Sequence, residues 1–211
     1  MGRIEDGGVE LLKRKLTVGD LRRANVPERY WDSSLKIVPD KLEHREKMRK
    51  YVENLPEMLG KGVGLYLWSD ENGTGKTSLS AIVVKEALRY GRTAFFEESS
   101  RLKTRLVNKE AFEEGTSVEA RIEMVDLLVL DDIGKEYRTN SGYAENLIET
   151  LVRNRVQKVR TTIMTGNVPP RDLQKLYSED FSALMKESMI PINVTGYDFR
   201  EAKAKSLRDL L

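Results

Sequence analysis

Short apolar runs alternate with amphipathic stretches along most of this 211-residue chain. Continuous apolar runs are typical of strands buried on both faces of a sheet, whereas apolar residues at every third or fourth position indicate helices. The apolar runs predict strands or extended segments at 64–68, 93–96, 127–130, 161–165 and 189–194. The amphipathic stretches predict helices over 40–59, 76–90, 142–157, 179–187 and 199–211, and a further helix that Ser99 or Ser100 could cap.

Strands separated by helix-length segments predict βαβ units, in which successive strands run parallel. We therefore expect one compact α/β domain over residues 26–211, built as a three-layer fold around a mainly parallel central sheet. Residues 1–25 are polar and charged, and we expect them to form a short N-terminal arm or helix.

Composition narrows the chemistry that this domain can perform. There is no cysteine and one histidine, His44. This excludes disulfides, thiolate zinc sites and cysteine nucleophiles, and it disfavours histidine metal cages and Ser-His-Asp triads. The 36 Lys and Arg residues balance 34 Asp and Glu to a net charge of +2, so any nucleic-acid-binding surface has to be local. Neither a signal peptide nor an 18-residue apolar stretch is present, which predicts a cytoplasmic protein without a membrane partner.

The strongest chemical signal is the run Gly-Thr-Gly-Lys-Thr at 73–77, between a predicted strand and a predicted helix. Glycines allow backbone N–H groups to surround phosphates, and the start of the helix adds its positive dipole end. Lys76 would reach the β- and γ-phosphates of ATP, and the Thr77 hydroxyl would hold Mg²⁺. We expect ATP or ADP to be bound by Asn72, Gly73, Thr74, Gly75, Lys76, Thr77 and Ser78.

One position departs from the full phosphate-loop pattern. That pattern has a glycine where this chain has Asp70, and Glu71 follows directly. Carboxylates beside a polyphosphate repel it, so a weakened nucleotide site is an alternative to a fully competent one. A glycine-rich turn without a ligand is the third interpretation.

Polar side chains end two of the other predicted strands. Asp131 and Asp132 follow the apolar run 127–130, and Asn167 follows 161–165. Alone, an Asp-Asp strand end is usually structural, but together with a phosphate loop it indicates an ATPase. Asp131 would then hold Mg²⁺, Asp132 would orient or deprotonate the attacking water, and Asn167 would contact the γ-phosphate and that water.

The order of these motifs resembles that of the AAA+ ATPases of the DnaC/DnaI helicase-loader and IstB transposition-helper group. The matching stretches are residues 26–35, which begin Val-Pro-Glu-Arg-Tyr, residues 73–77, residues 125–134 with their Asp-Asp-Ile-Gly ending, residues 162–167, and residues 196–200. The resemblance implies a RecA-like P-loop NTPase fold without a large C-terminal lid domain. It also implies that Asn167 and Arg200 act as the two sensors of the γ-phosphate, and that Arg101, Lys103 and Arg105 contact single-stranded DNA.

By this resemblance, Lys76, Asp131, Asp132, Asn167 and Arg200 form the catalytic set of a slow, Mg²⁺-dependent ATPase that a partner or DNA stimulates. Its function would be in DNA replication, loading a replicative hexameric helicase onto single-stranded DNA, and nucleotide could drive homo-oligomer formation.

Two other functions stay open, an IstB-like helper that serves a transposase and a non-hydrolysing helicase-binding scaffold. Asp70 and the lack of an arginine around Ala183, where many members carry one, favour the scaffold. A small-molecule kinase fits less well because no arginine-rich lid segment is evident.

Overall fold

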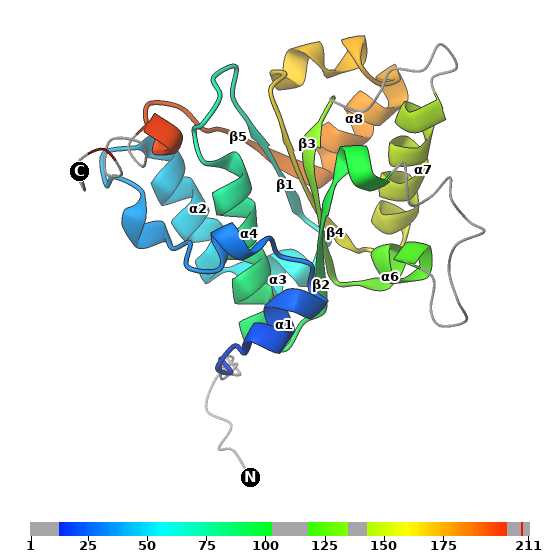
Figure 1. Ribbon diagram of the computed structural model, residues 1–211. Helices are drawn as coiled ribbons and strands as arrows, with labels where there is room; N and C mark the ends of the chain where they lie inside the picture. The colour runs from blue at the N-terminus through cyan, green and yellow to red at the C-terminus, as the bar shows by residue number, and fades with distance from the viewer. Residues whose placement is uncertain (1–12, 103–117, 135–142, 202–207, 209–211) are drawn as a thin grey trace, which may run out of the picture.

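The computed structural model describes residues 13–102, 118–134, 143–201 and 208. In these parts of the chain, five strands form one sheet with the order β2–β3–β4–β1–β5 (Figure 1). All four neighbouring pairs are parallel, which confirms the predicted parallel sheet. The strands are β1 (Gly64–Trp68), β2 (Ala94–Glu98), β3 (Leu127–Ile133), β4 (Thr161–Gly166) and β5 (Met189–Asn193).

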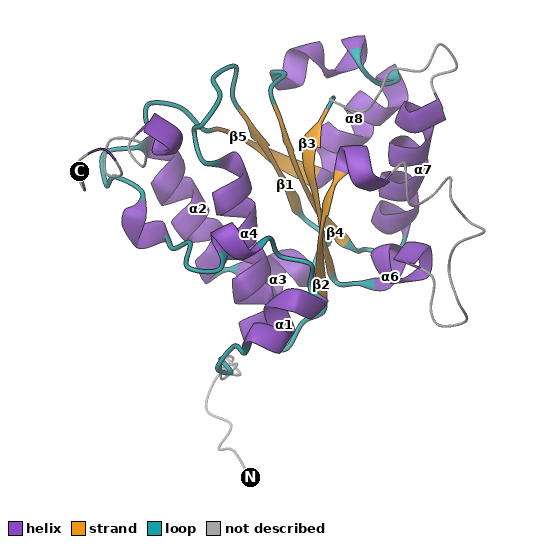
Figure 2. Cartoon of the chain, viewed as in Figure 1, coloured by secondary structure: helices purple, strands orange, loops and turns teal. Residues whose placement is uncertain are grey.

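Helices cover both faces of the sheet and produce three layers (Figure 2). One face carries α1 (Val18–Arg23), α2 (Glu43–Glu53), α3 (Leu55–Gly60) and α4 (Lys76–Arg89), and the other carries α6 (Val118–Met124), α7 (Tyr143–Gln157) and α8 (Glu179–Ser188). Short 3₁₀ turns are η1 (Glu28–Tyr30), η2 (Leu35–Ile37) and η4 (Pro170–Lys175). Within the described residues, no helix is long and apolar enough to cross a membrane.

The alternation of strand side chains between the two cores explains why the strands are continuously apolar. Leu127 and Val129 of β3 pack in the core that contains α4, whereas Leu128 and Leu130 pack in the core with α7. All four are fully buried. Each such side chain contributes about 1.5–3 kcal/mol of transfer free energy, so β3 anchors both layers.

The single helix expected over 40–59 is in fact two helices, and this prediction was wrong. α2 ends at Glu53 and α3 begins at Leu55, with Asn54 between them outside helical geometry. Pro56 is the cause, since proline has no N–H to donate to the carbonyl four residues earlier, that of Val52, and its ring would clash with that carbonyl in a continuous helix. Most of the predicted final helix, 199–211, lies outside the described residues.

The N-terminal segment covers the outer edge of β2. The Phe96 N–H donates to the Ala24 carbonyl at 2.8 Å, and the Asn25 side-chain amide donates to the Phe96 carbonyl at 2.7 Å. Exposed strand edges are templates for unwanted pairing between chains. These two contacts therefore satisfy β2 at a position where another strand could otherwise add.

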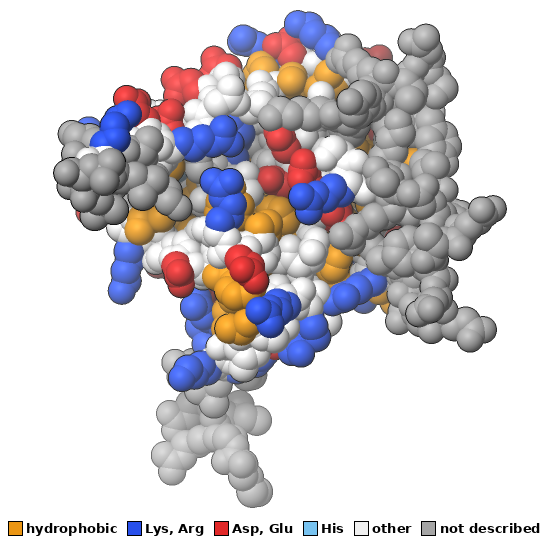
Figure 3. Space-filling view, viewed as in Figure 1, with side chains coloured by type: hydrophobic (Ala, Val, Ile, Leu, Met, Phe, Trp, Pro, Cys, Tyr) orange, Lys and Arg blue, Asp and Glu red, His pale blue; other side chains and the backbone are white. Residues whose placement is uncertain are grey.

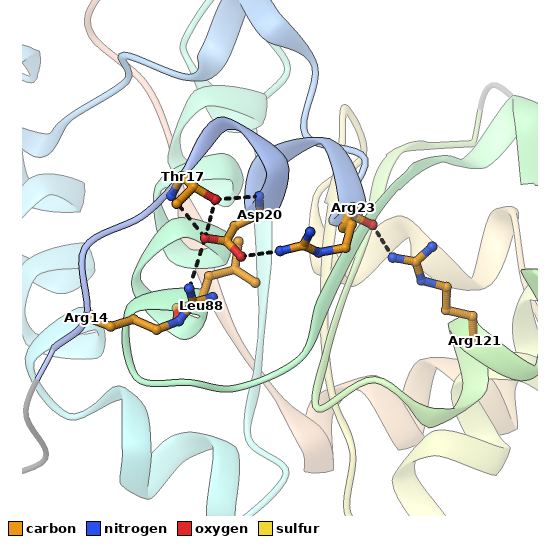
Figure 4. Close-up of polar contacts among 6 residues, drawn as sticks. All are labelled: Arg14, Thr17, Asp20, Arg23, Leu88 and Arg121. Atoms are coloured by element: carbon orange, nitrogen blue, oxygen red, sulfur yellow. Dashed lines mark hydrogen bonds and ion pairs between the residues drawn. The ribbon is translucent and has the colours of Figure 1, made fainter.

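Asp20 holds the same segment together from within, and its partner Arg14 joins the segment to α4 (Figure 4). Its buried carboxylate accepts from the Arg14 guanidinium at 2.9 Å, from the backbone and hydroxyl of Thr17, and from Arg23 at 2.6 Å. These hydrogen bonds, that from Arg14 foremost, hold the Asp20 pKa well below its usual value. Arg14 also donates to the Leu88 carbonyl at 2.8 Å, which joins the segment to the end of α4.

A buried arginine ties α7 to its neighbours on the far side of the sheet. Arg155 is fully buried, and its guanidinium donates to the carbonyls of Ile122, Val125 and Thr161 at 2.6–3.0 Å. Burial lowers its pKa to about 9. The carbonyls at the end of α6 and the start of β4 thus obtain donors in a place that water does not reach.

Val159 ends α7 in a backbone conformation that suits glycine. Its N–H donates to Val156 and the Arg160 N–H donates to Arg155, the pattern of a Schellman cap, and its φ is 53°. A left-handed conformation costs a β-branched residue about 1–2 kcal/mol, and the side chain is half exposed. Val159→Gly is therefore expected to raise the free energy of unfolding by about 1 kcal/mol in urea denaturation.

Val159→Ala is the matched control for this substitution, because it removes the methyl groups but keeps a Cβ in the left-handed region. It should give no gain in stability. Destabilisation by Val159→Gly would show that the valine side chain contributes more through packing on Gly62 than the strained backbone costs.

Candidate functional site

A cavity of about 430 Å³ opens at the carboxyl ends of β1, β3 and β4. Three groups of residues line it: the loop after β1, the ends of β3 and β4, and two segments from near the N- and C-termini. They are Asn72–Ser78, then Asp132, Thr165 and Asn167, and then Arg29, Tyr30, Asp32, Ser33, Ile37, Tyr197, Phe199 and Arg200. On the face drawn in Figure 3, the described acidic and basic side chains are interspersed.

The loop from β1 to α4 has the backbone of a phosphate cradle. Gly73 and Gly75 have φ values of 78° and 96°, which side chains other than glycine rarely adopt. α4 begins at Lys76 immediately afterwards, so its first N–H groups face the cavity. The Lys76 ammonium donates to the Glu71 carbonyl at 3.0 Å and therefore lies across the loop.

The C-terminal segment packs on the outer side of this loop. The Phe199 N–H donates to the Gly73 carbonyl at 3.0 Å. A Cβ on Gly75 would lie 2.8 Å from the Phe199 ring, and one on Gly73 would lie 2.3 Å from an Asp198 carboxylate oxygen. The backbone angles favour glycine at both positions, and a Cβ at either would force the side chain of Asp198 or Phe199 to shift.

Asp131 sits behind the loop and joins it to β4. One carboxylate oxygen accepts from the Thr77 hydroxyl at 3.1 Å, and the other accepts from the Thr165 hydroxyl at 2.7 Å. The side chain is almost fully buried, and this burial raises its pKa to about 6, although the two hydroxyl donors act in the opposite direction. The neighbouring carboxylates of Asp132 and Glu98 raise the pKa further.

Thr165 also fixes the backbone of Asp132. Its hydroxyl accepts from the Asp132 N–H at 2.8 Å, and Asp132 has a φ of 63° at an irregularity in the β3–β4 pairing. A left-handed aspartate at a strand end is strained, and such strain gathers at functional sites. Its effect here is that Asp131 turns toward Thr77 while Asp132 lines the cavity.

These residues fit a magnesium nucleotide. The glycine cradle and the start of α4 offer N–H donors to phosphates, and hydroxyl and carboxylate oxygens are the ligands that Mg²⁺ prefers. Thr77 and Asp131 would hold the cation, which when bound neutralises charge on the phosphate oxygens. Lys76 would hold the phosphates from the cavity side.

The structure gathers most of the predicted site residues at this one cavity. The nucleotide-binding run 72–78, Asp132, Asn167 and Arg200 line it directly, and Asp131 contacts Thr77 from behind. Asp70 is exposed and is not among the lining residues. Arg101 lines an adjacent cavity and lies 3.3 Å from Glu98, while Lys103 and Arg105 fall outside the described residues.

Sequence reasoning missed Thr165, Lys85 and the 29–37 wall as parts of the site. Thr165 precedes the predicted sensor residue by two positions, which is the one local signal that could have found it. Lys85 stands among apolar residues on the buried face of α4, so its charge in that position was a second signal. Residues 26–35, which overlap this wall, carry part of the family resemblance, but the place of the wall at the cavity depends on packing between distant parts of the chain.

Residues 67–190, more than half of the chain, match the family model described as IstB-like ATP binding protein. The chain belongs to this family. Membership in the IstB-like ATP-binding family confirms the resemblance drawn from the motifs, including the phosphate loop and the Asp-Asp strand that lie within the matched range.

Among curated proteins, the replicative helicase loader DnaC of Escherichia coli strain K12 is 31% identical over 137 residues, covering 63% of this chain and 53% of that protein. The DnaC loader of Buchnera aphidicola subsp. Schizaphis graminum is 26% identical over 167 residues, covering 75% and 65%. This IstB-like chain therefore spans between half and two thirds of the length of these relatives.

Solved structures agree on the fold. The DnaC helicase loader superimposes with a TM-score of 0.69 at 22% identity, covering 80% of this chain and all of that one. DnaI gives 0.67 at 20% identity, covering 80% and 94%. AMPPCP-bound DnaA from Aquifex aeolicus gives 0.62 at 18%, covering 87% and 56%. The expected P-loop NTPase fold is confirmed, and no large lid is apparent in the part of the chain that the structure describes.

Proposed function

We propose that this protein is an ATPase that loads a replicative hexameric helicase onto single-stranded DNA. The observation that carries the proposal is the meeting of the phosphate loop with Asp132 at one cavity and with Asp131 through the Thr77 hydroxyl, in a family member whose curated relatives are replicative helicase loaders. A loader needs a nucleotide-dependent switch more than rapid turnover, so we expect slow hydrolysis that DNA or the helicase stimulates.

Each residue of the catalytic set has a distinct task in this proposal. Lys76 neutralises the β- and γ-phosphates, and Thr77 with Asp131 holds Mg²⁺. Asp132, which lines the cavity, positions and deprotonates the attacking water. Asn167 follows β4 and Arg200 lies in the C-terminal segment, and both contact the γ-phosphate. Loss of the γ-phosphate would therefore remove a contact from both segments at once.

Asn167 is well placed to report on the nucleotide because the backbone next to it is held. The Tyr66 hydroxyl on β1 donates to the Val168 carbonyl at 2.7 Å. This bond links the strand that carries the phosphate loop to the turn that carries Asn167. A change at the phosphate loop therefore has a short covalent and hydrogen-bonded route to β4.

Single-stranded DNA is the proposed nucleic-acid ligand, and Arg101 is the described member of its expected binding group. Arg101 is exposed, and its guanidinium Nε lies 3.3 Å from a carboxylate oxygen of Glu98, which is itself half exposed. Arg22 and Arg29 line the same adjacent cavity, where the carboxylates of Glu28, Glu97, Glu98 and Asp131 alternate with the three arginines. Phosphate contacts by such residues supply sequence-independent affinity that falls steeply with salt.

The deciding experiment is size-exclusion chromatography of the chain with the replicative helicase of the same genome and with a transposase in parallel. We expect co-elution with the helicase in Mg²⁺-ATP, and ATP hydrolysis that rises when single-stranded DNA is added. DNA binding should weaken strongly between about 50 and 200 mM salt.

Each alternative function gives a different result in the same experiment. Co-elution with the transposase alone would identify a transposition helper. Co-elution with the helicase without hydrolysis above background, even with DNA present, would identify a scaffold. The exposed Ala183 on α8, where an arginine would complete a neighbour's site, makes the oligomeric state in ATP a useful second readout.

A further inference from the structure

α4 carries a lysine in the middle of its buried face. Lys85 is only 5% exposed, and the residues on either side of it on this face are apolar or small. It lies nine positions after Lys76, about two and a half turns along the same helix. Burying an ammonium group is costly unless hydrogen bonds replace its water. The partners of Lys85 therefore indicate what the residue is for.

Those partners are main-chain carbonyls of the segment between η1 and η2. The Lys85 ammonium donates to the Trp31 carbonyl at 2.7 Å and also to the Ser33 carbonyl. Burial lowers the pKa of Lys85, and the carboxylates of Asp32 and Glu86 act in the opposite direction. One side chain thus clamps the backbone on both sides of Asp32.

The clamped segment is a wall of the nucleotide cavity. Asp32 and Ser33 line the cavity, together with Tyr30 before them and Ile37 after them. The phosphate loop determines where phosphates lie, so this wall is left for the ribose and base of a nucleotide. Tyr197 and Phe199, with ring centroids 4.6 Å apart, line the same cavity from the C-terminal segment.

We infer that Lys85 is a positioning residue for the nucleoside half of ATP, holding the 30–37 wall in register with the phosphate loop. The inference rests on the proposed binding of ATP at this cavity. Lys76 and Lys85 belong to one rigid helix, α4. The phosphate site and the 30–37 wall are therefore positioned by the same element. Without the Lys85 ammonium, two partly buried carbonyls lose their donor and the wall moves, while the phosphate loop keeps its own contacts.

The test compares Mg²⁺-ATP with Mg²⁺-tripolyphosphate, which has the phosphates but no nucleoside, by isothermal titration calorimetry. In Lys85→Met the stem remains and the charge is lost. We expect its Kd for ATP to rise about ten-fold, equivalent to about 1.4 kcal/mol, with the Kd for tripolyphosphate unchanged within about two-fold. Lys36→Met removes an exposed lysine from the same wall and should change neither.

Several results would overturn the inference. An equal loss of affinity for ATP and for tripolyphosphate would show that Lys85 supports the whole fold. No loss of affinity for either ligand would show that the wall is held without Lys85. If Lys85→Met does not fold, Lys85→Gln is tested instead, because glutamine keeps N–H donors on a shorter stem. The inference requires that this variant also loses affinity for ATP and not for tripolyphosphate. Wild-type protein that binds neither ligand would instead refute the proposed ATP binding itself.

Discussion

Lys76→Ala is expected to lower the affinity for Mg²⁺-ATP by about 100-fold and to reduce hydrolysis to background. The Lys76 side chain lies across the phosphate loop, 3.0 Å from the Glu71 carbonyl, at the start of α4. It is the cation through which the cavity would neutralise the β- and γ-phosphates, and removing one preorganised donor of this kind costs about 10²–10³ in rate. Calorimetry and a phosphate-release assay with single-stranded DNA measure the two effects.

Lys50→Ala provides the control for this substitution, since Lys50 is an exposed lysine on α2. Its affinity for ATP should match that of the wild type. If Lys76→Ala bound ATP as tightly as the wild type, the cavity would not be a phosphate site, and the proposed ATPase would be refuted together with its loader function.

Asp131→Asn should separate stability from activity. Because burial raises the Asp131 pKa to about 6, against a usual value of 3.8, its ionised form disfavours the metal-free fold. This difference corresponds to about 3 kcal/mol at neutral pH. We therefore expect Asp131→Asn to unfold at higher urea concentration than the wild type in metal-free buffer, while Mg²⁺-dependent hydrolysis falls by about 100-fold or more.

The stability gained by Asp131→Asn should depend on pH, and the direction follows from the raised pKa of Asp131. Between about pH 4 and 6 the folded wild type retains a proton on Asp131 that the unfolded chain has released, so its stability falls as the pH rises through that window. The advantage of Asp131→Asn should be small near pH 4 and full above pH 6. An advantage independent of pH would contradict the assignment to this carboxylate, and Asp180→Asn, an exposed change on α8, should show neither effect.

The sheet and the phosphate loop were predictable because their signals are local. β1 and residues 127–130 of β3 are covered on both faces and are continuous apolar runs, β4 is rich in β-branched residues, and the loop motif sits between a strand and a helix in the sequence itself. β3 proved longer than predicted because Thr165 holds Asp131 and Asp132 in the strand. A polar residue that extends a strand by hydrogen bonding from a neighbouring strand does not change the pattern of apolar residues along the sequence.

The contacts that complete the site were not predictable, because they join residues far apart in the chain. Lys85 and the carbonyls that it holds are more than fifty positions apart, and Phe199 reaches Gly73 from the C-terminal segment. Arg155 has the same character, since a charged residue in an amphipathic helix is normally placed on the solvent side. In each case a buried polar group is satisfied by main-chain atoms whose position only the folded chain determines.

The packing of Asp198 and Phe199 against the phosphate loop bears on how mutated relatives should be interpreted. Because Gly73 and Gly75 have positive φ values and a Cβ at either would displace the side chain of Asp198 or Phe199, folding alone favours glycine at both positions. A relative that had lost ATP binding would still show the Gly-x-Gly pattern. Its loss of function would instead be visible at Lys76, whose side chain lines the cavity and whose ammonium lies across the phosphate loop. The lysine is therefore the more informative residue for separating ATPases from scaffolds in this family.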